Sequence, residues 1–502
     1  MKTVNCATLE ILDAIPCSVE ATFTKGLPSF SIVGLANNSI QESKDRVKSA
    51  LLVNEFKFPP LKITINLSPS DISKSGTHFD LSIALQIALH DKKIDFEDFY
   101  IFGELGLDGT LKNSSGLFAM ILSLAQQNKI KNILIPSCAK DIISVIPNIN
   151  IYCVNNLIEA IEFFQSNNKE EYRVKNILFD FPYIQINNKK YYYDTNYELD
   201  FAEVKGQTIA KKAALIACTG DHNIIFEGNP GSGKSMITKR MQYIMPPMSL
   251  EEILEKAKLD SIENAQPKFT PQRVFRSPHH SSTRASVFGG GSHKAKIGEI
   301  ALANNGLLFF DELPHFSKSI LEALREPLED HKILISRVNT KTTYHTKFMF
   351  VGAQNPCPCG NLLSKNKECR CSDLEIQRYK NRLSDPFLDR IDLYVVMNEV
   401  LAQDKATINS KEMQKMVIDA FSLQKQRGQT SLNGKLEDKD IKKYCILEPE
   451  AENILQKAIS NFSLSFRAIN KVLKVSRTIA DLNNSKNIDK TALLEALSFR
   501  KR

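Results

Sequence analysis

Two apolar runs near the middle of the chain each end in polar residues. Residues 223–227 read Asn-Ile-Ile-Phe-Glu and lead into a glycine-rich segment, after which residues 236–245 have the pattern of a helix. Residues 307–310, Leu-Leu-Phe-Phe, run directly into two acids. Unbroken apolar runs of this length are typical of strands that are buried on both faces of a parallel sheet. The pattern therefore predicts an α/β fold in which polar side chains gather where the strands end.

Other periodicities divide the rest of the chain. Residues 1–165 alternate between strand and helix patterns, with an alternating strand at 61–67 and helices expected at 39–53 and 80–89. Residues 166–199 are rich in Asn, Lys and Tyr, and we interpret them as a linker with one short hairpin around 183–193. The α/β unit is expected over 200–398, and 399–502 are expected to be helical. The helices predicted in that last part lie at 410–426, 438–444, 450–461, 466–482 and 489–499.

The glycine-rich segment carries the first candidate chemistry. It reads Gly228-Asn229-Pro230-Gly231-Ser232-Gly233-Lys234-Ser235, which matches the phosphate-binding loop G-x-x-x-x-G-K-[ST]. Backbone N–H groups of such a loop and the following helix N-terminus bind a polyphosphate. We expect these eight residues to bind ATP, with Lys234 neutralising the β- and γ-phosphates and Ser235 holding Mg²⁺. A chance match is the alternative, but the strand before the loop and the helix after it favour the motif.

The acids after the second apolar run are Asp311 and Glu312. We predict that Asp311 lies beside the direct ligands of Mg²⁺ and that Glu312 orients and polarises the attacking water. Taken alone, the same pattern fits an ordinary strand followed by an acidic helix start. Downstream of a phosphate-binding loop it predicts ATP hydrolysis.

Composition changes this picture little. With 502 residues, 42% of them hydrophobic and 24% charged, the chain has the composition of an ordinary soluble globular protein. No apolar run is long enough to span a bilayer, and Glu10 and Asp13 interrupt any secretory signal. We therefore expect a cytoplasmic protein with no membrane partner. The net charge of +8 permits nucleic-acid binding without requiring it.

Four of the ten cysteines cluster, as C-x-C…C-x-C. Such a cluster in a reducing compartment is typical of a tetrahedral thiolate zinc site rather than of disulfides. Two-residue spacers are more usual, so four reduced cysteines clustered by chance remain the alternative. A zinc ion bound within 357–371 would be structural, because four protein ligands leave no position open for water. The four candidate ligands are Cys357, Cys359, Cys369 and Cys371.

Further segments resemble one family of proteins. They are Phe275-Arg276-Ser277-Pro278-His279-His280-Ser281-Ser282, Gly289-Gly290-Gly291, Gly298-Glu299-Ile300, Asn304-Asn305-Gly306, Asn355-Pro356-Cys357-Pro358-Cys359-Gly360 and Leu388-Asp389-Arg390-Ile391-Asp392-Leu393. Together they are similar to the magnesium-chelatase-like AAA+ proteins of bacteria, the YifB/ComM group, and the resemblance runs through nearly the whole chain. It implies an AAA+ P-loop α/β core with a parallel sheet over 200–398 and a C-terminal helical lid over 399–502.

The resemblance also implies roles for three more residues. Asn355, after the apolar run 348–352, matches the sensor asparagine, which can hydrogen-bond the attacking water or the γ-phosphate. Arg390 resembles the arginine finger that enters a neighbouring subunit's site, with Arg382 a weaker match, and Arg467 resembles the lid sensor arginine. For each arginine, a surface charge or a structural salt bridge is the alternative. A finger from another copy implies a homo-oligomeric ring, expected to be a hexamer.

Residues 61–140 also resemble the Lon-type protease domain, an α+β fold of ribosomal S5 type. The position of the nucleophilic serine is occupied here by His78, or by Thr77 with a one-residue slip, and that of the catalytic lysine by Phe118. Phenylalanine cannot accept the proton of a nucleophile. We therefore expect residues 1–165 to form a non-proteolytic Lon-like domain.

The resemblance implies an ATP-driven ring motor on single-stranded or branched DNA, a branch-migration helicase of recombination or natural transformation. We expect pore loops at 282–296 and in a hairpin at 333–350 with Lys341 at its tip, and loop or DNA-contact roles for His279 and His280. One alternative is a chelatase motor subunit that drives Mg²⁺ into a porphyrin, although such subunits typically lack the Lon-like unit. The other is a regulator of ATP-dependent proteolysis.

Overall fold

The computed structural model describes residues 2–177, 179–263, 266–290, 296–336, 341–364, 366–400 and 403–500. The chain divides into two compact units. Unit 1 comprises Met1–Asp180 together with Leu254–Phe269, and unit 2 comprises Phe181–Ile253 together with Thr270–Arg502. The chain therefore returns once to unit 1, through the later part of helix α9 (Leu250–Ile262).

Unit 1 is built on a mixed sheet. Its strands are β1 (Lys2–Glu10), β2 (Asp13–Thr24), β3 (Ser29–Val33), β4 (Lys62–Ser68), β5 (Phe99–Ile101), β8 (Asn132–Pro136), β9 (Asn150–Val154) and β10 (Arg173–Val174). Their order in this eight-stranded sheet is β10-β9-β8-β5-β1-β2-β4-β3. β2 pairs antiparallel with β1 and β4, whereas β5 and β8 pair parallel with both of their neighbours.

The helices of unit 1 supply much of its core. Residues 80–87 of one helix and 117–124 of another are all buried. These helices match the pattern of apolar residues expected when a helix is covered on most sides. The helices are α1 (Asn38–Gln41), α2 (Ser43–Val53), α3 (Asp80–Ala88), α4 (Leu117–Gln126), α5 (Lys140–Ile143) and α6 (Leu157–Gln165), and a small hairpin joins β6 (Glu104–Leu105) to β7 (Leu111–Lys112).

Unit 2 contains the predicted parallel sheet. Its strands are β13 (Ile224–Gly228), β15 (Phe275–Arg276), β18 (Leu307–Phe310), β21 (Met349–Gln354) and β22 (Leu393–Met397). They are ordered β15-β18-β21-β13-β22, and every neighbouring pair is parallel. Every residue of β13, β18 and β21 is buried, which confirms the expectation from their unbroken apolar runs.

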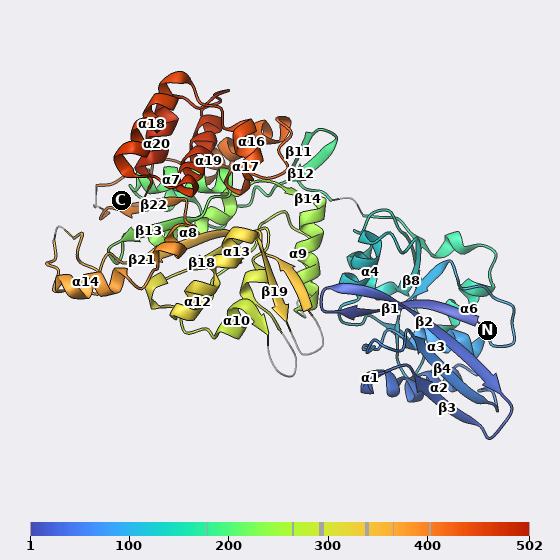
Figure 1. Ribbon diagram of the computed structural model, residues 1–502. Helices are drawn as coiled ribbons and strands as arrows, with labels where there is room; N and C mark the ends of the chain where they lie inside the picture. Colours follow the sequence, from blue (N-terminus) through green and yellow to red (C-terminus); the bar gives the residue numbers. More distant parts are fainter. Residues whose placement is uncertain are drawn as a thin grey trace. The chain divides into compact units, whose positions relative to one another are not determined.

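Helices surround this sheet and continue into the C-terminal part of the chain (Figure 1). Buried residues of the sheet, of helix α7 (Thr208–Gly220) and of the C-terminal helices form one continuous hydrophobic core. The helices at 410–426, 438–444 and 466–482 have the bounds predicted from periodicity. The helices of unit 2 are α7 (Thr208–Gly220), α8 (Lys234–Met241), α10 (Arg284–Phe288), α11 (Glu299–Leu302), α12 (Lys318–Ala323), α13 (Arg325–Asp330), α14 (Asp373–Lys380), α15 (Asp385–Leu388), α16 (Ser410–Gln426), α17 (Asp438–Tyr444), α18 (Pro449–Phe462), α19 (Phe466–Leu482) and α20 (Lys490–Ser498).

Short strands account for the remaining regular structure of unit 2. The hairpin predicted around 183–193 is β11 (Tyr183–Ile186) with β12 (Lys189–Tyr192), and β14 (Met248–Ser249) extends it to three strands. The segment expected to be a linker with one hairpin therefore also contributes β10, which was not expected, to the sheet of unit 1. Two further hairpins are β16 (Gly289–Gly290) with β17 (Lys296–Ile297), and β19 (Lys332–Ser336) with β20 (Lys341–His345).

The second of these hairpins is shorter than expected, because it ends at His345 and Met349 already belongs to the central sheet. Both expected pore loops fall partly outside the described residues, at 291–295 and 337–340, and so does the side chain of Lys341. Among the described residues, no helix is both long enough and apolar enough to cross a membrane.

Candidate nucleotide-binding site

The glycine-rich loop joins two elements at the carboxyl edge of the parallel sheet. β13 ends at Gly228 and α8 begins at Lys234. Gly231 and Gly233 adopt φ values of 82° and 91°, and nothing lies within 4 Å of the place where either would carry a Cβ. Left-handed backbone favours glycine, and the open space beside it lets a ligand approach the backbone closely. The loop therefore has the conformation that binding of a polyphosphate requires.

Lys234 is held inside this loop. Its Nζ donates hydrogen bonds to the carbonyl oxygens of Gly228 at 2.6 Å and Asn229 at 3.0 Å, and to Oδ1 of Asn355 at 3.2 Å. Burial lowers the pKa of Lys234, and the carboxylates of Asp311 and Glu227 oppose that shift. The structure thus brings together two residues that lie far apart in sequence and that were both expected at the phosphates.

Ser235 and Asp311 also meet here. Ser235 Oγ donates to Oδ2 of Asp311 at 2.9 Å, and the other carboxylate oxygen accepts from the backbone N–H of Glu312 at 2.9 Å. A hydroxyl beside a carboxylate is a donor set of hard oxygens, which Mg²⁺ prefers. These residues therefore fit a magnesium ion next to the phosphate-binding loop.

Glu312 stands directly after this carboxylate with its side chain exposed to solvent. Its φ of 51° is unusual for a residue other than glycine. Oε2 of Glu312 lies 3.5 Å from Nδ1 of His280, and the rings of His280 and His279 are 4.2 Å apart between centroids. Nothing in the spacing of His280 and Glu312 indicated this contact, because strand pairing across the sheet creates it.

A buried carboxylate behind the loop was not expected. Glu227, the penultimate residue of β13, is only 6% exposed. Its Oε2 accepts a hydrogen bond from Gln354 Nε2 at 2.6 Å and another from the hydroxyl of Tyr394. Burial and the charge of Glu227 raise the pKa of Tyr394, so this phenol stays protonated and donates. The three side chains tie three adjacent strands together just below the loop.

Arg390 and Arg467 lie elsewhere. Asn223, which precedes β13, donates from Nδ2 to the carbonyl oxygen of Arg390 at 3.0 Å. Gly228 lies at the other end of β13, about 16 Å away at about 3.3 Å per residue. Arg390 is thus at the amino edge of the sheet, and the structure does not bring it to the phosphate-binding loop of its own chain.

Both arginines pair with one acid at that edge. Glu329, in α13, accepts from the guanidinium of Arg390 through one carboxylate oxygen and from that of Arg467 through the other. Arg390 lines a cavity of about 730 Å³ together with Glu329 and residues of α10 and α12. Arg382, the weaker candidate, instead donates to the carbonyl oxygen of Pro314 at 3.1 Å. Glu329 carried no motif that could have identified it.

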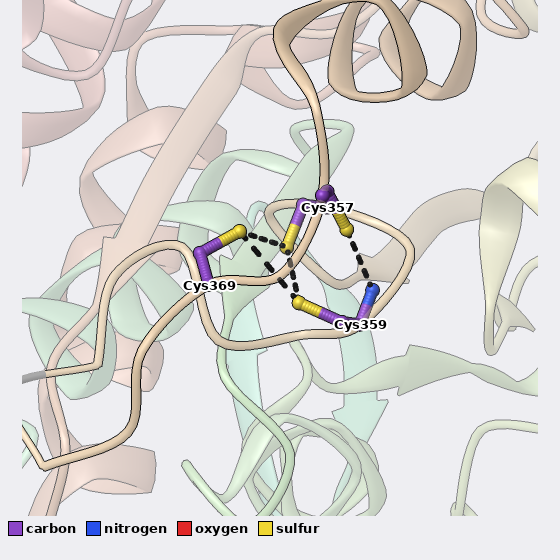
Figure 2. A group of neighbouring side chains, drawn as sticks. Cys357, Cys359 and Cys369 are labelled. Carbon is purple, nitrogen blue, oxygen red and sulfur yellow. Dashed lines mark hydrogen bonds between the residues drawn. The ribbon is translucent and has the colours of Figure 1, made fainter.

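The four clustered cysteines are brought together in space. Figure 2 shows the sulfur atoms of Cys357, Cys359 and Cys369 turned toward one another. The backbone N–H of Cys359 points at the sulfur of Cys371, with 3.4 Å between N and Sγ. All four sulfur atoms lie within 4.8 Å of one another. The structure therefore places every ligand predicted for zinc in one cluster.

The protease-like positions of unit 1 hold no serine and lysine. His78 is buried with its Nε2 2.8 Å from the carbonyl oxygen of Ala7, and burial lowers its pKa to about 4. Phe118 packs edge-on against Phe269, with 5.3 Å between ring centroids. Neither side chain offers a nucleophile with an adjacent amine.

Three family models match consecutive parts of the chain. The model described as subunit ChlI of Mg-chelatase matches residues 19–138, and the one described as magnesium chelatase, subunit ChlI, matches residues 200–405. The third, magnesium chelatase, subunit ChlI C-terminal, matches residues 407–500. The matches therefore cover the proposed site and both units.

Known proteins are similar over almost the full length. The chain is 36% identical over 496 residues to competence protein ComM of Haemophilus influenzae, which covers 96% of this chain and 94% of that protein. It is 34% identical over 498 residues to protein YifB of Escherichia coli, with 97% and 95% covered. A more distant match, 21% identical over 304 residues, is the maternal DNA replication licensing factor mcm6 of Xenopus tropicalis, with 55% of this chain and 32% of that protein covered.

Proposed function

The chain belongs to the magnesium-chelatase-like ComM/YifB family of AAA+ ATPases, and on that premise we propose that it is an ATP-driven ring motor that remodels branched DNA. The observation that supports a ring most strongly is the separation of its site residues between opposite edges of one sheet. One relative is a competence protein and a more distant one is a DNA replication factor, which supports DNA as the substrate. We propose branch migration as the activity.

Residues at the carboxyl edge bind ATP and position the attacking water. The phosphates take the open space beside Gly231 and Gly233, and Lys234 turns from the loop carbonyls toward the β- and γ-phosphates. Ser235 and Asp311 would hold Mg²⁺, which neutralises phosphate charge when bound.

Two further side chains act on the γ-phosphate. Glu312 orients the water and accepts its proton, and Asn355 hydrogen-bonds the water or the γ-phosphate. The hydrogen bond between Lys234 and Asn355 supports this arrangement, because it places the asparagine beside the group that binds the phosphates.

Residues at the amino edge act on a second copy. Arg390 lies beside the amino end of β13, whereas the phosphate-binding loop follows its carboxyl end. Arg390 is therefore too far away to reach the phosphates of its own chain, and it serves the site of a neighbouring subunit. Arg467 also pairs with Glu329, and it acts on the site of the same neighbouring subunit. A guanidinium there stabilises negative charge on the transferring phosphoryl group. Head-to-tail contacts of this kind close into a ring, which we propose to be a hexamer.

DNA passes over loops that face the ring's channel, for which we propose the segment 282–296 and the hairpin of β19 and β20, which ends at His345. In unit 1, the Lon-like domain is non-proteolytic and organises the ring or binds DNA. The packing of His78 and Phe118 supports this, because it leaves no Ser–Lys pair at those positions.

The test measures ATP turnover of the purified full chain without DNA, with single-stranded DNA and with forked DNA, and follows migration of a labelled four-way junction. We expect forked DNA to raise turnover several-fold, and junction migration to need ATP. Lys234→Ala abolishes both, whereas Lys239→Ala, an exposed lysine of the same helix, leaves both intact. Turnover that no DNA stimulates, with no junction processed, overturns the proposal.

A chelatase motor is the second candidate, because all three family models carry that description. Such a motor would hydrolyse ATP at a rate indifferent to DNA and would raise its rate with a porphyrin-binding partner. The same turnover assay therefore separates the two functions.

A further inference from the structure

The cysteine cluster lies in a segment with little structure of its own. Within the described residues, no helix or strand occurs between Gln354 at the end of β21 and Asp373 at the start of α14. A stretch this long without regular structure needs something else to hold it in one conformation. Four converging thiols are the feature that could do so.

The geometry of the cluster fits a metal ion. A tetrahedral zinc site with Zn–S bonds of about 2.3 Å separates its sulfur atoms by about 3.8 Å. The observed Sγ–Sγ distances are 3.4 Å between Cys357 and Cys359, 3.7 Å between Cys357 and Cys369, and 3.6 Å between Cys359 and Cys369 (Figure 2). Disulfides are excluded among them, because an S–S bond is about 2.05 Å long.

The fourth thiol completes the set. Cys371 accepts the N–H of Cys359, and backbone donors of this kind stabilise the thiolate ligands of metal sites. Cys357 is fully buried while the other three are partly exposed, so one ligand anchors the site and the others leave a path for an ion.

This segment touches the phosphate-binding loop at two points. A Cβ on Gly360 would lie 2.7 Å from the ring atoms Cγ and Cδ of Pro230, so the backbone beside Cys359 presses on the loop. Oε1 of Glu399 accepts from Ser364 Oγ at 2.5 Å and from Asn229 Nδ2 at 3.1 Å. Glu399 therefore bridges the cysteine segment to the loop that we propose binds ATP.

We propose that the four cysteines bind one Zn²⁺ and that this ion holds residues 357–371 against Pro230 and Asn229, so that zinc occupancy sets the affinity of the nucleotide site. The second half of the proposal rests on the proposed function, whereas the metal site does not. The ion takes no part in hydrolysis, because four thiolates leave it no open position.

The first experiment measures metals in the full chain purified under reducing conditions without chelator. We expect about one zinc per chain, as a four-thiolate structural site binds. Cys369→Ser/Cys371→Ser loses the zinc, whereas Cys138→Ser/Cys153→Ser, in unit 1, keeps it. Cys371→His keeps it too, because histidine is also a zinc ligand. Iron in place of zinc, or zinc far below one per chain in the wild type, overturns the metal assignment.

The second experiment measures binding of a fluorescent ADP analogue to zinc-loaded and chelator-treated wild type. Removal of zinc should weaken binding by about tenfold, and added zinc should restore it. Glu399→Ala should keep its zinc and still weaken binding, because it removes the bridge between Ser364 and Asn229 without altering a ligand. Equal affinity in all these proteins overturns the coupling.

The two experiments fail independently. A wild type that contains zinc but binds no nucleotide contradicts the proposed function and leaves the metal site standing. A wild type that binds nucleotide but contains no zinc contradicts the metal site and leaves the proposed function standing.

Discussion

The two edges of the five-stranded sheet differ in what their polar residues can reach. At the carboxyl edge, two hydrogen-bonded pairs lie beside an open loop, namely Lys234 with Asn355 and Ser235 with Asp311. At the amino edge, two arginines converge on one glutamate beside a cavity. One edge has the groups that we propose bind a phosphate and a metal ion. The other has positive charges of the kind that stabilise a transferring phosphoryl group.

Distance along the strands separates these two sets. A strand of five residues is rigid and about 16 Å long, so no side chain at one edge can serve the other within the same chain. This separation is the basis of our proposal that a complete site requires two copies of the chain. Glu329 supplies the counter-charge that two partly buried guanidinium groups at this edge require.

The largest effect is expected at the amino edge. Arg390→Ala should lower ATP turnover by about 10³-fold or more, because the loss of an arginine finger costs that much. Nucleotide affinity of the dilute protomer should stay unchanged, since Arg390 does not reach its own loop. Steady-state turnover and a nucleotide titration check both.

The matched control is Arg325→Ala, which lines the same cavity and pairs with Glu322. It should turn over ATP normally. If Arg390→Ala instead loses nucleotide affinity and keeps its rate, the two edges are not halves of one site.

The next effect is expected at the carboxyl edge. Glu312→Gln should lower turnover by about 10²–10⁴-fold, because an amide cannot take a proton from water. ATP binding should persist, which a nucleotide titration checks. Ring assembly should persist too, which light scattering checks. Glu326→Gln, an exposed acid of α13, serves as the control. Turnover near that of the wild type would show that Glu312 takes no part in the hydrolysis step.

The smallest effect is expected for Glu329→Ala, which removes both ion pairs. Glu329 is 39% exposed and its partners Arg390 and Arg467 are 12% and 49% exposed, so solvent screening limits the loss in the free energy of unfolding to about 1–2 kcal/mol. Turnover should change by less than about tenfold. Urea denaturation measures the stability. A loss of several kcal/mol would favour a structural salt bridge at this edge over a finger.

The strands and loops of the nucleotide site could be predicted because their signals are local. Unbroken apolar runs located β13 and β18, and the phosphate-binding loop and its two acids followed directly. Helix α16 begins where expected, since Asn409 and Glu412 form a capping box there. These features depend on neighbours within a few residues.

The rest depends on contacts between distant segments. Glu227 with Tyr394, His280 with Glu312, and Glu329 with both arginines meet only after the strands pair. No pattern indicated that Leu254–Phe269 joins unit 1, because the periodicity of α9 continues across the boundary. The cysteine cluster could be predicted from spacing, but its contacts with Pro230 and Asn229 could not.

The most direct test mixes subunits that are defective at opposite edges. Lys234→Ala and Arg390→Ala proteins should each be inactive, and an equal mixture should regain turnover at about one site in four, because random assembly in a ring places an intact loop beside an intact finger that often. Co-purification of one variant through an affinity tag carried only by the other confirms that the two co-assemble. A mixed ring as inactive as either parent would contradict a site shared between neighbouring copies.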